Sequence, residues 1–229
     1  VATQAEVATH AGAATRAEAS SAARALEGAP AEEVVAWARD RFGAGLVLAA
    51  SFQDCVLIDL ATRVVPDIEV VFLDTGAHFP ETLAFVQQVR RRYQLRLQVR
   101  RPVVRPDEDP CGSARCCELR KVALLDRALQ GRTAWMTGLR RVEATTRSST
   151  PVVGWDERRG LSKISPLAAW TDADVEAFAR ARNLPVHPLA ARGYTSIGCQ
   201  PTTRPVADGE HQRAGRWAGT TKTECGLHA

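Results

Sequence analysis

The chain has 229 residues, of which 45% are hydrophobic and 24% are charged, the size and balance of one globular domain with an appended segment. These values exclude collagen, a coiled coil and disorder throughout. Its 30 lysines and arginines outnumber its 26 aspartates and glutamates by four, and this small positive charge is spread along the chain. The charge therefore gives no reason to expect nucleic acid as a partner.

Nothing in the sequence resembles a membrane-spanning segment. The longest apolar run, Gly45–Ser51, has the length of a strand and is far shorter than the roughly 20 residues that span a bilayer. Glutamates interrupt the alanine-rich opening and no signal-type apolar core follows, so we interpret residues 1–30 as an N-terminal helix or tail. We expect a cytoplasmic protein with no membrane partner.

Cysteine is the unusual feature of the composition. Secreted disulfide scaffolds are short and dense in cysteine, whereas this chain has the size of a full domain and two of its cysteines are adjacent. The pattern favours a reducing compartment in which thiols bind metal or take part in catalysis. The six cysteines are Cys55, Cys111, Cys116, Cys117, Cys199 and Cys225.

Strand and helix patterns alternate along most of the chain. Continuous apolar runs indicate strands buried on both faces, and apolar residues at helical spacing indicate helices that pack on them. In chain order we expect a helix over Ala31–Phe42, a strand over Gly45–Ser51, a helix after Asp54 through Thr62, a strand and loop over Glu69–Gly76, a helix over Pro80–Tyr93, a strand over Leu95–Val99, a loop over Pro102–Pro110, a helix over Glu118–Leu129, a strand over Thr133–Gly138 and a helix over Trp170–Arg182.

This alternation predicts an α/β protein with a mostly parallel, twisted sheet and helices on both faces. In such a sheet, ligands bind beyond the carboxyl ends of the strands. Regular periodicity ends near Pro185. We therefore divide the chain into an N-terminal helix or tail (1–30), an α/β domain that carries the ligand site (31–200) and an extended, mobile C-terminal tail (201–229).

Three polar loops follow predicted strands. The Ser51–Asp54 loop opens into a helix whose N-terminus suits phosphate or sulfate, but it lacks the GK[ST] and GxGxxG patterns, and an ordinary polar turn is the alternative. Leu73–Gly76 is placed to meet an adenine edge and a ribose, or simply turns the chain. Thr137–Arg141, continuing to Arg147, carries paired guanidinium groups that suit an anion, or it forms a solvated basic face.

Three cysteines have a spacing that indicates metal binding. Cys116 and Cys117 open a basic helix, and Cys199 lies in a loop with glycine and proline. Soft thiolates with positive charge nearby favour an iron–sulfur cluster or zinc. A cubane cluster takes four cysteines, and this arrangement offers three.

Cys225 lies near the C-terminus among cationic residues. Cationic neighbours lower the pKa of a thiol and so increase the population of the nucleophilic thiolate. Glycines on either side would let the tail present its thiol first to a buried substrate and then to a protein reductant, whereas the alternative is an idle, exposed cysteine. The cationic neighbours are Arg213, Arg216, Lys222 and His228.

Four segments together carry a specific resemblance: Cys116–Val122, Thr137–Arg141, Ile197–Pro201, and Arg213–Trp217 with Lys222–His228. From about Ala31 to its C-terminus, the chain resembles the assimilatory adenylyl-sulfate reductases, which are related to phosphoadenylyl-sulfate reductases. The resemblance implies a fold similar to the ATP pyrophosphatases (adenine nucleotide α-hydrolase-like). It also implies reduction of adenylyl sulfate to sulfite and AMP, with thioredoxin or glutaredoxin as the reductant.

The same resemblance implies roles for individual residues. Cys225 resembles the nucleophile that attacks the sulfur of adenylyl sulfate and becomes an S-sulfocysteine. Cys116, Cys117 and Cys199 resemble ligands of a [4Fe–4S] cluster. The residues implied to bind substrate are Ser51, Gln53, Leu73, Asp74, Thr75, Gly76, Lys121, Arg140, Arg213, Arg216 and His228.

The sequence departs from the family at Thr202, where the family has the second cysteine of a CxxC pair. Threonine is a poor iron ligand at neutral pH because its hydroxyl group is scarcely ionised. Four outcomes are open: a three-cysteine cluster with a vacant or exogenous site, a three-iron cluster, recruitment of Cys111, or no cluster. We place recruitment of Cys111 last, because it lies only five residues before Cys116 and its loop would have to refold. Cys55 and Cys111 are therefore expected to be structural.

Three further hypotheses stay open. The incomplete cysteine set favours a phosphoadenylyl-sulfate reductase with an incomplete or absent cluster. The Ser51 loop is consistent with an ATP pyrophosphatase-like adenylating enzyme, although the SGGxDS loop of that class is missing. The three cysteines alone are consistent with a zinc-binding module without activity, which leaves the Cys225 tail unexplained. The oligomeric state is open, a homo-oligomer included.

Overall fold

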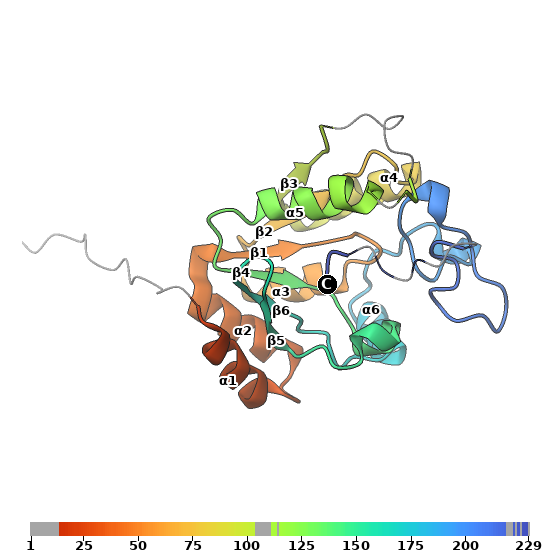
Figure 1. Cartoon of the computed structure of the whole chain (residues 1–229). Helices are drawn as coiled ribbons and strands as arrows, with labels where there is room; N and C mark the ends of the chain where they lie inside the picture. The colour runs from red at the N-terminus through yellow and green to blue at the C-terminus, as the bar shows by residue number, and fades with distance from the viewer. Residues whose placement is uncertain are drawn as a thin grey trace, which may run out of the picture.

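The computed structural model describes residues 14–103, 111–113, 115–218, 222, 224 and 226–228. These residues form a six-stranded sheet in the order β3-β2-β1-β4-β6-β5 (Figure 1). Neighbouring strands are parallel except at one edge, where β5 runs antiparallel to β6. The mostly parallel sheet predicted from the sequence is confirmed. The strands are β1 (Leu46–Ala49), β2 (Glu69–Leu73), β3 (Arg96–Arg100), β4 (Ala134–Thr137), β5 (Val153–Asp156) and β6 (Leu161–Ile164).

The helices of the described residues match the predicted ones closely, and α1 is the helix expected as one of two alternatives within residues 1–30. The helix α1 begins after Thr15, whose side chain accepts a hydrogen bond from the backbone of Glu18 while Glu18 bonds back to Thr15, a capping box. The other helices follow the strands in alternation. They are α1 (Arg16–Leu26), α2 (Ala31–Phe42), α3 (Val56–Val64), α4 (Pro80–Tyr93), α5 (Ala123–Ala128) and α6 (Asp172–Ala181).

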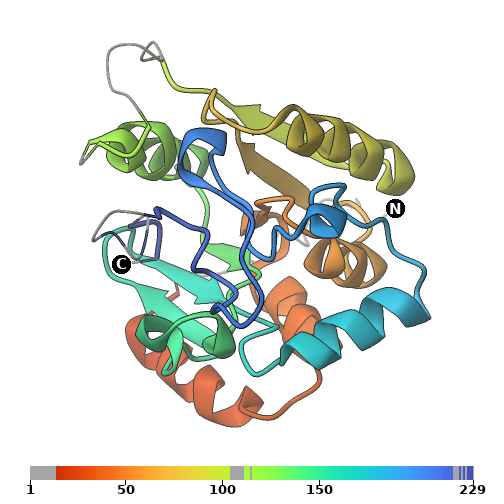
Figure 2. The ribbon, with the colours of Figure 1, turned by 90° about the vertical axis from the view of Figure 1, so that its right-hand side faces the viewer.

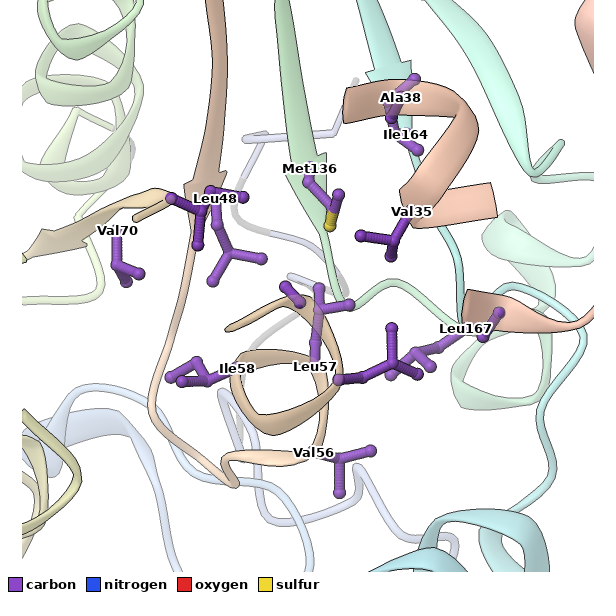
Figure 3. Close-up of a cluster of buried hydrophobic side chains, with 14 of the residues drawn as sticks. Val35, Ala38, Leu48, Val56, Leu57, Ile58, Val70, Met136, Ile164 and Leu167 are labelled. Carbon is purple, nitrogen blue, oxygen red and sulfur yellow. The ribbon is translucent and has the colours of Figure 1, made fainter. Parts of the chain in front are cut away.

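The central strands are buried on both faces, as their continuous apolar runs predict. On one face, Leu48 and Met136 pair in register and pack with α2 and α3 in the main hydrophobic core (Figure 3). On the other face, Val47 and Trp135 pair in register and pack against α5. The two layers of helices therefore hold the strand ends rigidly, and the loops that follow β1, β2 and β4 are placed by a packed core.

The strands β5 and β6 are absent from the sequence prediction, which ended the sheet at the fourth strand. Each has four residues, and neither is a continuous apolar run. They form a hairpin, and β6 joins the sheet by parallel pairing with β4. The segment predicted as one helix over Glu118–Leu129 also differs, because its first turn, Glu118–Val122, is a π-helix.

The chain after α6 is irregular and lies across the carboxyl-terminal edge of the sheet (Figure 2). Two backbone hydrogen bonds fold this region back on itself: Arg204 N donates to Gly215 O at 3.0 Å, and Trp217 N donates to Thr202 O at 2.9 Å. Trp217 is consequently buried. In the part of the chain that the structure describes, no helix combines the length and the apolar character that crossing a membrane requires.

Candidate active site

A cavity of about 210 Å³ opens at the carboxyl ends of β1, β2 and β4. This is the edge at which parallel α/β sheets bind their ligands. The strand-end loops supply one part of its wall, and the irregular C-terminal region supplies the other. Among the lining residues are Ser51, Gln53, Leu73, Lys121, Arg140, Arg147, Arg213, Arg216, Glu224 and His228.

The loop after β1 is held in one conformation by its own side chains. Phe52 is fully buried and has a φ of 56°, a left-handed conformation that is strained for a bulky residue. Asp54 accepts a hydrogen bond from the backbone N of Val56, the first residue of α3, at 3.0 Å, and burial raises the pKa of this carboxyl group. Gln53 Oε1 accepts a hydrogen bond from Ile197 N at 2.9 Å. The loop is therefore tied to the C-terminal wall of the cavity.

The loop after β2 serves the cavity at one end and the cysteine region at the other. Leu73 lines the cavity, and its carbonyl oxygen lies 3.0 Å from His78 Nε2. Asp74 accepts hydrogen bonds from Gly76 N and from Arg101, at 3.1 and 2.9 Å. Asp74, Thr75 and Gly76 are not among the described residues that line the cavity, so their contact with substrate stays a prediction.

Arginines and a lysine make much of the cavity wall basic. Lys121, Arg140, Arg213 and Arg216, all predicted from the sequence, line the cavity together. Arg140 is almost fully buried, with its Nη1 2.8 Å from Asp172 Oδ1. Several guanidinium groups around one cavity suit a ligand that carries phosphate and sulfate.

Arg216 is positioned by a close approach of the backbone. Its Nη1 donates to Ile197 O at 3.2 Å, and its guanidinium carbon lies 4.6 Å from the centre of the Trp217 ring. A Cβ atom at Gly198 would lie 2.4 Å from Arg216 Nη2. Only glycine leaves room for the guanidinium group at this point, which explains the glycine in the Ile197–Pro201 segment.

The described C-terminal residues dock into the cavity. The Glu224 carboxylate binds Arg147 through two hydrogen bonds of 2.8 Å each and lies 3.3 Å from Arg213. The sequence prediction did not include Glu224 in the site, and it named Arg147 only as the end of the basic run that begins at Thr137. Glu224 stands beside Cys225 in the specific C-terminal motif, and Arg147 lies six residues after the arginine pair at Arg140–Arg141, so both positions were open to prediction. Cys225 itself lies outside the described residues.

His228 lines the cavity and stacks on Trp135, with ring centres 5.8 Å apart and ring planes 5° from parallel. Lys163 lies over the same indole, its Nζ 5.3 Å from the ring centre. Burial, followed by repulsion from Lys163, lowers the pKa of His228 well below its usual value. The imidazole is therefore neutral at neutral pH and packs as an aromatic ring.

The cysteines predicted to bind metal lie beside this cavity. Cys116, Cys117 and Cys199 are all buried. Lys222 Nζ lies 3.1 Å from Cys117 Sγ, and Thr75 Oγ1 lies 3.5 Å from Cys199 Sγ. Among the described residues, no three His, Cys, Asp or Glu side chains converge on a single metal ion. A cubane cluster does not require its cysteines to converge on one metal ion, because each cysteine binds a different iron.

Cys111 is part of the same group, and the expectation that its loop must refold to reach it is wrong. Its Sγ lies 3.7 Å from Thr202 Oγ1, at the position where the family has a cysteine. The nearby Cys111 thiol lowers the pKa of Cys199, an effect to which Lys121 adds. The prediction considered only how close Cys111 lies to Cys116 in the sequence. In the fold, the short turn Gln200–Thr202, which is distant in the sequence, lies next to Cys111.

The remaining cysteine, Cys55, is separate. It is buried, its Sγ lies 3.6 Å from Pro185 O, and burial raises the pKa of its thiol to about 12. This is consistent with the structural role expected for it. None of the described cysteines forms a disulfide.

Together these features define an α/β protein whose cavity, at the carboxyl edge of a mostly parallel sheet, is built for an anionic ligand. Residues 45–205 match the family model of the phosphoadenosine phosphosulfate reductase domain. The chain belongs to this family.

Two comparisons agree with this assignment, and a third agrees with the fold alone. The adenosine 5′-phosphosulfate reductase of Streptomyces coelicolor is 47% identical over 212 residues, which cover 89% of this chain and 90% of that relative. The crystal structure of a phosphoadenylyl-sulfate reductase from Candida auris, in a phosphate complex, is 26% identical with a TM-score of 0.71, and covers 83% of this chain and 98% of its own. An FMN adenylyltransferase of Candida glabrata (19% identity, TM-score 0.59, covering 76% and 63% of the two chains) shares the fold.

Proposed function

We propose that this protein reduces adenylyl sulfate to sulfite and AMP, with Cys225 as the nucleophile and a thioredoxin-type dithiol protein as the reductant. The name of the Streptomyces relative and the similarity over nine-tenths of its length support the substrate. The basic cavity at the strand ends supports an anionic nucleotide. The adenylating alternative loses support, because the tail with its cysteine has no part in such a reaction.

The observation that carries this proposal is the docking of the C-terminal motif. Glu224 and Leu227, the described residues nearest to Cys225 that line the cavity, lie on either side of it in the sequence. Glu224 is held by Arg147 and Arg213, and Leu227 packs in the cluster that covers one face of the sheet. A tail anchored on both sides of its cysteine in a substrate cavity is what a nucleophile on a tail requires.

The reaction balances in two steps. First, the Cys225 thiolate attacks the sulfur of the sulfate group, the bond from that sulfur to the phosphate oxygen breaks with its electron pair on AMP, and an S-sulfocysteine forms. Then a thiolate of the reductant attacks Cys225 Sγ and sulfite leaves with the electron pair of the S–S bond. The second thiol of the reductant resolves the mixed disulfide, so the dithiol is oxidised as the sulfur is reduced. Arg140, Arg213 and Arg216 are placed to stabilise the charge on the leaving phosphate.

An iron–sulfur cluster at the cysteine group is part of this proposal. The donor set fits: buried sulfurs with Lys222 and Lys121 nearby to offset the negative charge of thiolates. Cys116, Cys117 and Cys199 would hold it. When bound, the group would join the start of the Cys116 helix to the Cys199 loop and place negative charge near Lys121.

A sulfite-release assay with reduced thioredoxin tests the function. We expect a kcat/KM for adenylyl sulfate at least tenfold above that for its 3′-phosphorylated form. We expect Cys225→Ser to abolish sulfite release while AMP still binds, and Cys55→Ser, the matched control, to retain activity. A preference for the 3′-phosphorylated nucleotide would replace the substrate by the phosphoadenylyl sulfate of the alternative hypothesis. Unchanged turnover in Cys225→Ser would reject the nucleophile.

A further inference from the structure

We propose that Cys111 supplies the fourth thiolate of the cluster, in the place that Thr202 leaves without one. The inference rests on the proposed cluster and goes beyond it, because the family's second cysteine pair is incomplete here and Cys111 belongs to neither pair. It makes the set four cysteines, Cys111, Cys116, Cys117 and Cys199, all within the described residues.

Thr202 stands at the position where the family has a cysteine. Its Oγ1 lies 3.7 Å from Cys111 Sγ and 3.4 Å from Cys199 O. The family has a cysteine sulfur at residue 202, and here the Thr202 side chain takes its place. The Cys111 sulfur, which comes from a different segment of the chain, is in van der Waals contact with that side chain. A cluster that uses a sulfur at this point does not need it to come from residue 202.

The backbone next to Cys111 is positioned by Gly112. Gly112 has a φ of 101°, a conformation open to glycine and strained for other residues. A Cβ atom at Gly112 would lie 3.2 Å from Thr202 Cγ2. The turn at Gly112 thus brings the chain directly against Thr202, and a larger residue in its place would push Cys111 away from the group.

Cys111 is also linked to the cysteine pair Cys116 and Cys117. Ser113 Oγ accepts a hydrogen bond from Cys116 N at 3.0 Å, so the residues after Cys111 cap the start of the helix that carries the pair. The Cys111 thiol interacts electrostatically with Cys199 and with Cys116. Cys111 thus borders both of the segments that hold the other three thiols.

Binding of iron at Cys111 replaces the proton of its thiol, which passes to solvent, and transfers no electron. Thiolate is a soft ligand that suits iron in a cluster, and a threonine hydroxyl is not. Thr202 and Cys111 therefore have different roles in this proposal. Thr202 packs against Gly112, and Cys111 provides the sulfur ligand.

The test compares the full chain with Cys111→Ala, Cys55→Ala and the double variant Cys111→Ala/Thr202→Cys, each treated with ferrous iron and sulfide under anaerobic conditions. Cys55→Ala removes a cysteine that lies apart from this group and is the matched control. We expect four irons and four sulfides per chain in the parent and the control. In Cys111→Ala we expect the loss of at least one iron, with the electron paramagnetic resonance signal of a three-iron cluster where a cluster remains. The double variant should regain four irons.

Iron and sulfide content in Cys111→Ala equal to that of the parent would overturn the proposal. Failure of the double variant to regain iron would also overturn it, since Cys111 would then act by shaping its loop and not as a ligand. A parent chain that takes up no iron and sulfide would remove the cluster itself. The sulfite-release assay on the same samples reports separately on the proposed reaction, because metal content is measured without substrate.

Discussion

At the scale of single residues, the site shows one carboxylate in an unexpected place. Glu224 lies in a cavity whose basic groups suit an anionic substrate, and it forms ion pairs with Arg147 and Arg213. Next to these arginines the pKa of Glu224 is lowered, although burial acts against this. Glu224 is therefore ionised at neutral pH and serves as the anchor that holds the residues next to Cys225 in the cavity.

This anchor gives a prediction for Glu224→Gln. The variant keeps the shape of the side chain and loses its charge, and hydrogen bonds to charged groups contribute about 1.5–3 kcal/mol. We expect kcat to fall by roughly tenfold or more, because the docked tail is populated less. AMP affinity should stay the same or increase, since Arg147 and Arg213 each lose one carboxylate partner. Steady-state kinetics and calorimetry with AMP measure the two effects.

The control for this variant is Glu176→Gln, which removes an exposed carboxylate on α6 that pairs with Arg180. It should leave kcat and AMP affinity unchanged. A kcat in Glu224→Gln equal to that of the control would mean that the anchor has no part in catalysis.

At the scale of elements, His187 joins the irregular chain after α6 to the N-terminal end of α4. Its Nδ1 accepts a hydrogen bond from Leu189 N at 3.2 Å, so the neutral ring carries its proton on Nε2, which donates to Thr82 Oγ1 at 3.0 Å. Protonation of Nδ1 would break the bond to Leu189 N. Burial lowers the pKa of His187 to about 4, from an ordinary value of 6.5.

The low pKa of His187 predicts a loss of stability in acid. Between pH 6.5 and 4, the unfolded chain binds a proton at this imidazole and the folded chain does not, so the free energy of unfolding falls as the pH falls. The contribution is complete above pH 6.5, and about 2 kcal/mol of it should be lost at pH 4.5. His187→Gln should be less stable than the parent at pH 7 but show a smaller change between pH 7 and 4.5.

Urea unfolding at the two pH values measures this difference. His211→Gln, at an exposed histidine, is the control and should follow the parent at both. If the parent and His187→Gln lost the same free energy of unfolding between pH 7 and 4.5, the pH dependence would have to come from other groups.

The elements also show where sequence reasoning succeeds and where it stops. The strands β1, β2 and β4 were predictable because each is buried on both faces and so has a continuous apolar run, as in Glu69–Leu73. The hairpin Val153–Ile164 was missed because each of its strands has only four residues and neither is a continuous apolar run. In β6, two adjacent polar residues, Ser162 and Lys163, separate Leu161 from Ile164.

Some residues of the candidate site could likewise be predicted from the sequence, and others could not. Arg140 and Gln53 were predictable because they follow buried strands directly, and parallel strands end at one edge of the sheet. The approach of Cys111 to Thr202 was not, because it depends on where two irregular segments, 91 positions apart in the sequence, cross. No local periodicity records such a crossing.

At the scale of the whole molecule, the proposed reaction asks one thiol to meet two partners. The residues next to Cys225 are docked among side chains of β1, β4 and the C-terminal wall, in a cavity of about 210 Å³. A dithiol protein has no room in a cavity of this size. With a protein of this kind as the reductant, the tail would leave the cavity before the reductant acts, and the two chemical steps would belong to two positions of the tail.

This separation predicts a first step that needs no reductant. Mixed with excess adenylyl sulfate alone, the chain should release one AMP per active site in a burst and then stop, and mass spectrometry should find one added SO₃ on the peptide that carries Cys225. Reduced thioredoxin added afterwards should release one sulfite and restore the thiol. Cys225→Ser should show no burst and no added mass. If instead AMP appeared only once thioredoxin was present, the reductant would act within the first step, and a tail that carries the sulfur from the cavity to its partner would be the wrong description of this protein.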